Sequence, residues 1–455
     1  MRSSPLPARK QTLVAVLALA LLTLAATLAI PAPATASGVV EIAAGEFHTC
    51  ALTSSATVKC WGDNGNGQLG DGTTTQRNTP VDVAGFVTGA TDLDGGFGFT
   101  CARTTSAAMK CWGLNSLGQL GATSSDTCGL LACSLSPLDI TGLGAKVVSI
   151  AAGRDHTCVA LTTGGVKCWG NNEWGQLGDG TVCGVVCTAI DVPGVSGAVA
   201  VTGGQSHTCA LTSGGGVKCW GLNDHGQLGD GGACGFACTA VDVSSLTSGV
   251  AAIAAGGSHT CALTTGSGVK CWGSNYSGQL GDGQTCSTSS CSSPVDVSGL
   301  TSGVGAIAAG NGHSCARLAT GGLKCWGWNN EGQLGVTTSE LCPEACSSTP
   351  EDVPLGSAKV VSFAAGQWHT CAIQAGGVAK CWGYNAAGQL GNGSKTDSTA
   401  PVTVSGLTPK AVGGITELAD AATGRSSWPA LAVTAALGAL GLGMAAWLLV
   451  RGRRL

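Results

Sequence analysis

The chain has 455 residues, of which 44% are apolar, 11% charged and only 4% aromatic, so its composition argues against wholesale disorder. The 74 glycines speak against a helical protein, because each interior glycine costs a helix about 1 kcal/mol. Six of the 22 basic residues lie near the two ends, which leaves 16 basic against 26 acidic residues between them, a net charge of about −10 that argues against DNA or RNA as a partner.

Residues 1–36 have the pattern of a secretory signal peptide. Three basic residues precede an apolar stretch at Leu13–Ile30, and Ala34-Thr35-Ala36 supplies a small-residue cleavage site. An uncleaved membrane anchor is the alternative. The pattern predicts export, with Ser37 as the first residue of the mature protein.

One sequence unit then recurs seven times. The segment Lys-Cys-Trp-Gly returns every 51–57 residues, with its tryptophan at Trp61, Trp112, Trp169, Trp220, Trp272, Trp326 and Trp382. Ala-Ala-Gly-x-x-His-Thr-Cys-Ala-Leu or a close variant precedes it, and x-Asn-x-x-Gly-Gln-Leu-Gly follows. A period of this length indicates a repeat architecture.

Within the first unit we expect four short strands, at Val39–Ala43, Thr49–Thr53, Thr57–Trp61 and Pro80–Val83. Small, glycine-containing loops between the second and third strands of most units suit a hairpin. Four strands per unit, repeated seven times, predict an all-β fold over residues 37–407. That fold is a seven-bladed β-propeller with four-stranded antiparallel blades.

The segments His-Thr-Cys-Ala-Leu-Thr, Val-Lys-Cys-Trp-Gly and Asn-x-x-Gly-Gln-Leu-Gly closely resemble the regulator of chromosome condensation repeat. The resemblance extends over all seven units. It implies a seven-bladed propeller that acts mainly as an interaction platform; one nuclear member is a nucleotide exchange factor, and a secreted bacterial member inhibits β-lactamases. The predicted signal peptide argues against a nuclear role and favours the secreted bacterial type.

All 24 cysteines fall into pairs of two kinds. Seven pairs face each other across the hairpin of strands two and three, where opposed residues lie within disulfide range: Cys50 with Cys60, Cys101 with Cys111, Cys158 with Cys168, Cys209 with Cys219, Cys261 with Cys271, Cys315 with Cys325 and Cys371 with Cys381. Five closer pairs follow Gln-Leu-Gly: Cys128 with Cys133, Cys183 with Cys187, Cys234 with Cys238, Cys286 with Cys291 and Cys342 with Cys346. In an exported protein both kinds predict disulfides rather than zinc sites, because zinc usually needs four convergent ligands.

No motif in the sequence indicates a catalytic or cofactor site. Six repeats carry a histidine at one position and the second carries Phe99, so we expect each histidine to bond the backbone of its own or the next blade rather than a metal. The Asn-Gly and Asp-Gly stretches lack the glutamate of a calcium loop and indicate turns. We therefore expect no cofactor, no metal and no enzymatic activity.

The repeats differ mainly in aromatic residues at loop positions. In a four-stranded meander, the loops after strands one and three lie on the same face of the propeller. Most of the aromatic residues that differ between repeats are in these loops. We predict that this face binds a partner, because Trp, Tyr and Arg carry much of the energy of interfaces, with loop packing as the alternative. The predicted residues are Phe47, Arg154, Trp174, His225, Tyr276, Trp328, Trp368 and Tyr384.

A polar stalk at 408–427 precedes a second apolar run, Trp428–Val450. Its 23 residues would span ~34 Å as a helix, enough to cross a hydrocarbon core of ~30 Å. The arginines in the basic tail, residues 451–455, predict a cytoplasmic end. A sortase-processed cell-wall tail is the alternative, although the leucine-proline start of that motif is missing.

These observations predict a disulfide-stabilised propeller tethered to the outside of a cell membrane, on a bacterial surface. Its function would be to bind an extracellular protein or glycan through one loop face, with the membrane as a second partner through the C-terminal helix. An extracytoplasmic enzyme or inhibitor, and a purely structural surface protein, are the alternatives.

Overall fold

The computed structural model describes residues 38–407, except 87, 183, 233–234, 285–290 and 342–344. The predicted signal peptide, stalk, apolar C-terminal segment and basic tail lie outside the described residues and stay predictions. Within the described ranges, no helix is both long and apolar enough to cross a membrane.

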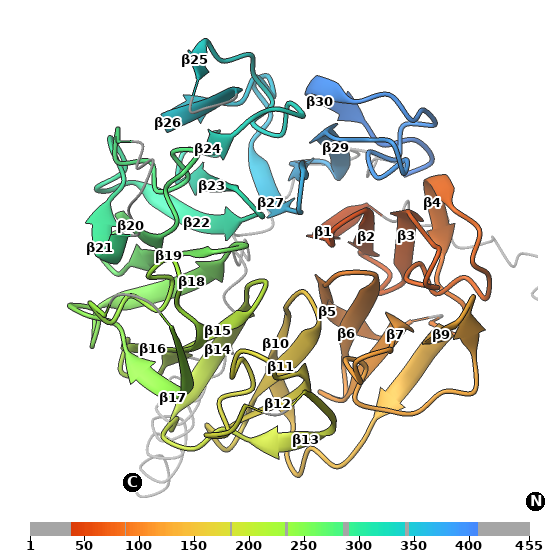
Figure 1. The fold of residues 1–455 in the computed structure, drawn as a ribbon. Helices are drawn as coiled ribbons and strands as arrows, with labels where there is room; N and C mark the ends of the chain where they lie inside the picture. The colour runs from red at the N-terminus through yellow and green to blue at the C-terminus, as the bar shows by residue number, and fades with distance from the viewer. Residues whose placement is uncertain are drawn as a thin grey trace, which may run out of the picture. The chain divides into compact units, whose positions relative to one another are not determined.

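Seven antiparallel sheets form a ring with the first strand of each sheet innermost (Figure 1), and the ends of these strands line an opening that we call the channel mouth. Each sheet, or blade, consists of strands that are consecutive in the chain, and no helix occurs among the described residues. The predicted all-β propeller with seven four-stranded blades is confirmed, although blades 2 and 6 each gain a two-residue fifth strand.

The first four blades use these strands: in blade 1, β1 (Val39–Ala44), β2 (His48–Thr53), β3 (Val58–Gly62) and β4 (Arg77–Asp82); in blade 2, β5 (Ala90–Gly95), β6 (Phe99–Thr104), β7 (Met109–Leu114), β8 (Thr127–Cys128) and β9 (Leu131–Ile140); in blade 3, β10 (Val147–Ala152), β11 (His156–Leu161), β12 (Val166–Asn171) and β13 (Val185–Asp191); in blade 4, β14 (Ala198–Gly203), β15 (His207–Thr212), β16 (Val217–Leu222) and β17 (Phe236–Asp242).

The last three blades use these strands: in blade 5, β18 (Val250–Ala255), β19 (His259–Thr264), β20 (Val269–Gly273) and β21 (Cys291–Asp296); in blade 6, β22 (Val304–Ala309), β23 (His313–Leu318), β24 (Leu323–Trp328), β25 (Glu340–Leu341) and β26 (Ala345–Asp352); in blade 7, β27 (Val360–Ala365), β28 (His369–Gln374), β29 (Val378–Gly383) and β30 (Ser398–Thr403).

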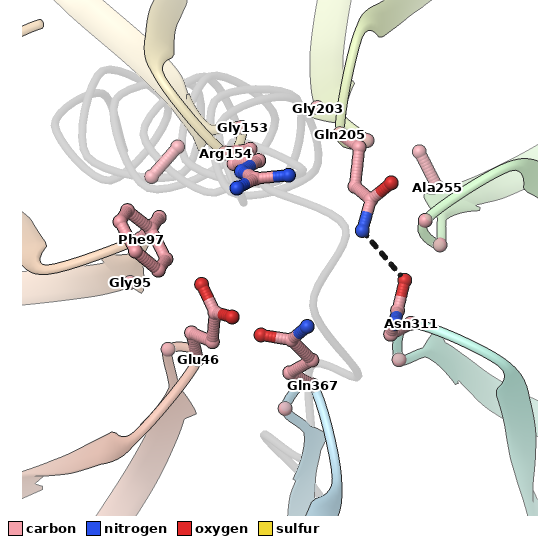
Figure 2. Close-up of a pocket in the computed structure, with 18 of the residues that line it drawn as sticks. Glu46, Gly95, Phe97, Gly153, Arg154, Gly203, Gln205, Ala255, Asn311 and Gln367 are labelled. Carbon is pink, nitrogen blue, oxygen red and sulfur yellow. Dashed lines mark hydrogen bonds between the residues drawn. The ribbon is translucent and has the colours of Figure 1, made fainter.

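Backbone hydrogen bonds join neighbouring blades around the mouth of the channel, which Figure 2 draws from above. Phe97 N donates to Arg154 O at 3.0 Å, and Arg154 N donates to Gly204 O at 3.1 Å. Gln367 N of blade 7 donates to Gly45 O of blade 1 at 3.4 Å. The ring therefore closes through contacts between whole blades, without a strand exchanged between the two ends of the chain.

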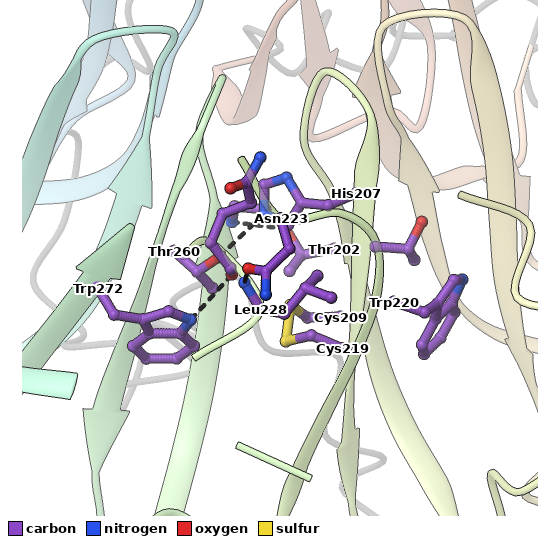
Figure 3. Close-up of a disulfide and its surroundings, with 12 residues drawn as sticks. Thr202, His207, Cys209, Cys219, Trp220, Asn223, Leu228, Thr260 and Trp272 are labelled. Atoms are coloured by element: carbon purple, nitrogen blue, oxygen red, sulfur yellow. Dashed lines mark hydrogen bonds between the residues drawn. A yellow bond between two sulfur atoms is a disulfide. The ribbon is translucent and has the colours of Figure 1, made fainter. Parts of the chain in front are cut away.

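One polar network, repeated around the ring, connects each pair of blades, and Figure 3 shows it between blades 4 and 5. His207 Nε2 lies 2.9 Å from Thr260 Oγ1 of the next blade. Thr260 Oγ1 in turn donates to Gln227 O at 3.0 Å, and Trp272 Nε1 donates to the same carbonyl at 2.9 Å. The repeated tryptophan thus lies between blades, as predicted, and is fully buried in all seven.

The prediction that the histidines bond backbone atoms is wrong, because each bonds a hydroxyl of the next blade, as His48 does with Thr100. The single proton of the Thr100 hydroxyl is already donated to Gln68 O. Nε2 of His48 must therefore carry a proton and donate it, and the buried Nδ1, which has no hydrogen-bond partner among the described residues, is unprotonated in the neutral imidazole. This agrees with burial, which lowers the pKa of His48 from 6.5 to about 4.

All seven predicted hairpin disulfides are present. Cys50 and Cys60 are direct cross-strand partners in β2 and β3, with Cα atoms 4.1 Å apart. Each bond lies one residue from the buried tryptophan of its blade, so it fixes the hairpin that carries the contact with the neighbouring blade (Figure 3). The same bond forms in the other six blades, where it joins Cys101 with Cys111, Cys158 with Cys168, Cys209 with Cys219, Cys261 with Cys271, Cys315 with Cys325 and Cys371 with Cys381.

The second kind of cysteine pair is confirmed in one case and contradicted in another. Cys128 and Cys133 are bonded across the β8–β9 hairpin, and Cys346 is also disulfide-bonded. Cys238 is a free thiol, against the prediction, because it lies inside β17 with its Cα and Sγ against the Gly175 turn of blade 3. Four members of these pairs, Cys183, Cys234, Cys286 and Cys342, lie outside the described residues, and the side chains of Cys187 and Cys291 are not described either.

Candidate interaction face

We call the surface formed by the loop after the first strand of every blade, together with the four residues after its Trp-Gly, the loop face. The glutamine of the Gly-Gln-Leu-Gly motif fixes the backbone of the loop after the third strand. Its Oε1 accepts a hydrogen bond from Trp174 N at 2.9 Å in blade 3 and from His225 N at 2.8 Å in blade 4. The repeated asparagine accepts from the following leucine N–H, as Asn172 does from Leu177 at 3.0 Å. Repeated amides thus fix the loop backbones on which the variable residues stand.

Four of the eight predicted residues are exposed: Arg154, described below, and three on the loops after the third strands of the adjacent blades 3, 4 and 5. Trp174 is 43% exposed and Tyr276 is 55% exposed, and both follow the third strand of their blade. His225 is exposed at the equivalent loop of blade 4. Large aromatic side chains exposed at this level are unusual in a chain so poor in aromatic residues.

Four other predicted residues pack against one another where blades 6, 7 and 1 meet, and we call them the aromatic cluster. The Trp368 ring centroid lies 5.3 Å from that of Phe47, 5.5 Å from that of Tyr384 and 6.2 Å from that of Trp328, all edge to face. All four are only half-buried. The buried Nε1 of Trp368 has no hydrogen-bond partner among the described residues.

The eighth predicted residue, Arg154, stands at the channel mouth instead (Figure 2). The mouth is an open cavity of about 480 Å³, counting the solvent space at its opening, and its wall is formed by alanines and glycines at the ends of the first strands. Its rim carries one variable side chain from almost every blade: Glu46, Phe97, Arg154, Gln205, Asn311 and Gln367. Arg154 lies 5.2 Å from the Phe97 ring centroid and 3.4 Å from the Asp155 carboxylate.

The cavity adjoins the aromatic cluster because two loops contribute to both. Glu46 and Gln367 line the cavity, and the residues that follow them, Phe47 and Trp368, belong to the cluster. Burial raises the pKa of Glu46 from 4.5 to about 7, opposed by the charge of Arg154 and reinforced by Asp155. The carboxyl group is therefore in a partly water-excluded position at the centre of the loop face.

Sequence reasoning missed five of the six rim residues, because it sought departures from the repeat mainly among aromatic side chains. The signal was present at the first position after the motif glycine, which reads Glu46, Phe97, Arg154, Gln205, Gly257, Asn311 and Gln367 around the ring. Gly257 is required there, since an added Cβ would overlap Asn311 Oδ1, which accepts from Gln205 Nε2 at 2.9 Å across blade 5.

Two family models, both described as the regulator of chromosome condensation (RCC1) repeat, match the propeller. One matches residues 39–68, 147–176, 198–227, 250–279, 306–333 and 360–389. The other matches residues 57–103, 111–160, 215–263, 269–317 and 321–373. Together they cover most of the described chain.

Full-length relatives and solved structures agree with these models. The ultraviolet-B receptor UVR8 of Arabidopsis thaliana is 30% identical over 391 residues, covering 83% of this chain and 84% of the receptor. The secretion-regulating guanine nucleotide exchange factor of Bos taurus is 28% identical over 385 residues, covering 78% and 80%. The structure of Prp20p from Saccharomyces cerevisiae has the same fold, with a TM-score of 0.67 and 24% identity over 78% of this chain and 87% of that one. The chain therefore belongs to the regulator of chromosome condensation repeat family.

Proposed function

We propose that this propeller is a protein-interaction module that binds its partner through the loop face. The observation that carries the proposal is the collection of solvent-facing and half-buried aromatic side chains on that one face, beside a cavity. Exposed aromatic anchors next to a concave site are typical of binding surfaces.

The family supports a protein rather than a glycan as the partner. Structural studies of its members concern the binding properties of Prp20p to Gsp1p and histones, and Kap60 bound to yeast RCC1. The buried bonds between blades are made by residues that recur in the repeat. The variable loop residues take no part in these bonds and are available to contact a partner.

We further propose that the protein acts on the outside of a cell, tethered by the apolar segment Trp428–Val450. The signal-peptide pattern and the disulfide on every blade support this location, because such bonds persist in oxidising compartments. Truncation after residue 427 is the direct check, since the proposal requires the shortened protein to appear in the medium.

The binding proposal is tested by capture of surface proteins from cells with the immobilised full-length protein. The double variant Trp174→Ala/Tyr276→Ala removes two exposed anchors, each worth about 1–4 kcal/mol if it is buried by the partner. We expect capture to fall at least tenfold. The melting temperature should scarcely change, because neither ring packs in the core.

The matched control is Leu130→Ala/Phe236→Ala, which removes two exposed apolar side chains outside the loop face, one in the β8–β9 turn of blade 2 and one at the start of β17 in blade 4. Capture should be unchanged in this control and should disappear when the cell surface is first treated with protease. Equal losses in the two double variants would show nonspecific hydrophobic capture, and capture that survives protease but not glycan oxidation would make the partner a glycan.

A further inference from the structure

The loop face carries an excess of acidic residues. The two residues after each motif glycine and the four after each Trp-Gly include six acids and one permanently charged base, Arg154. The acids are Glu46, Asp63, Asp155, Glu173, Asp224 and Glu331. A surface with this excess attracts cationic partners and repels anionic ones.

The opposite end of the blades differs because its acids are paired. In six blades the lysine of Lys-Cys-Trp-Gly forms an ion pair with an aspartate at the end of the outer strand, as Lys218 does with Asp242 at 2.7 Å. The aspartates at that end are thus paired with lysines, whereas the six acids against one base counted on the loop face leave it a formal net charge of −5.

Glu46 is the acid in the most recessed position, and it lacks a partner. Among the described residues nothing donates a hydrogen bond or forms an ion pair with its carboxylate, whereas the Arg154 guanidinium is held by Asp155 and by the Phe97 ring. Figure 2 shows Glu46 and Gln367 side by side and directed into the opening. The group that would complete this arrangement is a cation with several N–H donors.

The cavity has room for such a group. Its space of about 480 Å³, solvent at the opening included, is open towards solvent, and its wall consists of small residues such as Ala44 and Gly95. Oxygen atoms of Gln205, Asn311 and Gln367 stand on the rim as further acceptors (Figure 2). A long side chain with a terminal ammonium or guanidinium matches both this depth and these acceptors.

We propose that the loop face binds a basic polypeptide segment and that the channel mouth receives one of its lysine or arginine side chains, which pairs with Glu46. This inference rests on the proposed function as a protein-interaction module and names the chemistry of the partner. Trp174 and Tyr276, on the surrounding loops, offer aromatic faces to the flanking basic residues.

The test measures binding of a fluorescein-labelled hexalysine peptide to the full-length protein by fluorescence anisotropy. We expect hexalysine to bind, with an affinity that falls as salt rises, and hexaglutamate and a glycine-serine hexamer not to bind. Glu46→Gln should weaken hexalysine binding about tenfold or more, because it removes a charge-assisted hydrogen bond. Gln205→Trp, which fills the cavity without changing the charge, should weaken it similarly.

Asp242→Asn is the matched control, since it removes one acid from the opposite end of a blade, and its effect should stay below about twofold. Equal weakening by Glu46→Gln and Asp242→Asn would overturn the proposal in favour of general attraction, and unchanged binding by Gln205→Trp would exclude insertion. Displacement of hexalysine by an equal concentration of spermidine would instead assign the cavity to a free polyamine. In each of these cases, loss of capture by Trp174→Ala/Tyr276→Ala would still support the interaction function.

Discussion

At the scale of single residues, the blade interface depends on one hydroxyl that serves two partners. Thr208 Oγ1 accepts from His156 Nε2 at 2.8 Å and donates to Gln176 O at 2.9 Å. The carbonyl keeps a second donor, Trp220 Nε1, if the hydroxyl is removed, but the imidazole does not. An unpaired buried N–H is the more costly of the two losses.

We therefore expect Thr208→Val to lower the free energy of unfolding by about 1–3 kcal/mol more than Thr157→Val does. Thr157 also donates to a glutamine carbonyl, at 2.7 Å, but blade 2 has Phe99 where the others have histidine, so no imidazole loses its partner. Urea unfolding of both variants checks this. Equal losses would mean that the histidine contributes nothing through this bond.

The buried histidines also determine how stability depends on pH. Burial lowers the pKa of His156 from 6.5 to about 4, so between these pH values the unfolded chain binds a proton that the folded chain does not. Stability is complete above about pH 6.5 and falls as the pH drops towards 4, at ~1.4 kcal/mol per pH unit for each such histidine. His156→Phe, the residue blade 2 already uses, should reduce this slope by one histidine's share in urea unfolding between pH 6.5 and 4. An unchanged slope would contradict the assignment.

At the scale of strands and hairpins, the sequence predicted most of what the structure contains. Alternating short apolar stretches and turn residues located the strands, and the ten-residue spacing placed Cys50 opposite Cys60, because hairpin register is a local property. The His–Thr bonds and the cavity rim were not predicted, since they join residues of different blades. Trp328, Trp368 and Tyr384 were predicted to bind a partner from separate loops, and their packing against one another across blades 6 and 7 was not foreseen.

Cys238 in β17 is a second case in which contacts between blades could not be predicted from the sequence. Its spacing from Cys234 suggests a pair, yet the neighbouring blade determines where its thiol lies. Burial, and then the charge of Asp179, raise the pKa of this thiol, so alkylation needs alkaline pH. Peptide mapping without reductant should find alkylated Cys238 beside an intact Cys209–Cys219 bond. A disulfide-linked Cys238 would restore the original pairing.

At the scale of the whole propeller, the contacts between blades are regular, whereas the residues exposed on the loop face vary from blade to blade. The buried contacts repeat in every blade, including the closing one, where Trp61 Nε1 of blade 1 donates to Gln389 O of blade 7 at 2.9 Å. The exposed loop positions differ from blade to blade, and their differences converge on one aromatic and acidic surface. Stability and recognition are thus assigned to different residues of the same repeat.

The most direct test that the loop face binds the partner is oxidative footprinting of the full-length protein, alone and bound to the surface protein that it captures. The account predicts protection of Trp174, Tyr276 and Trp368 on the loop face, with Leu130 in the β8–β9 turn and Phe236 at the start of β17 oxidised as in the free protein. Protection of Leu130 and Phe236 or of the opposite end of the blades, with Trp174 and Tyr276 still oxidised, would contradict it.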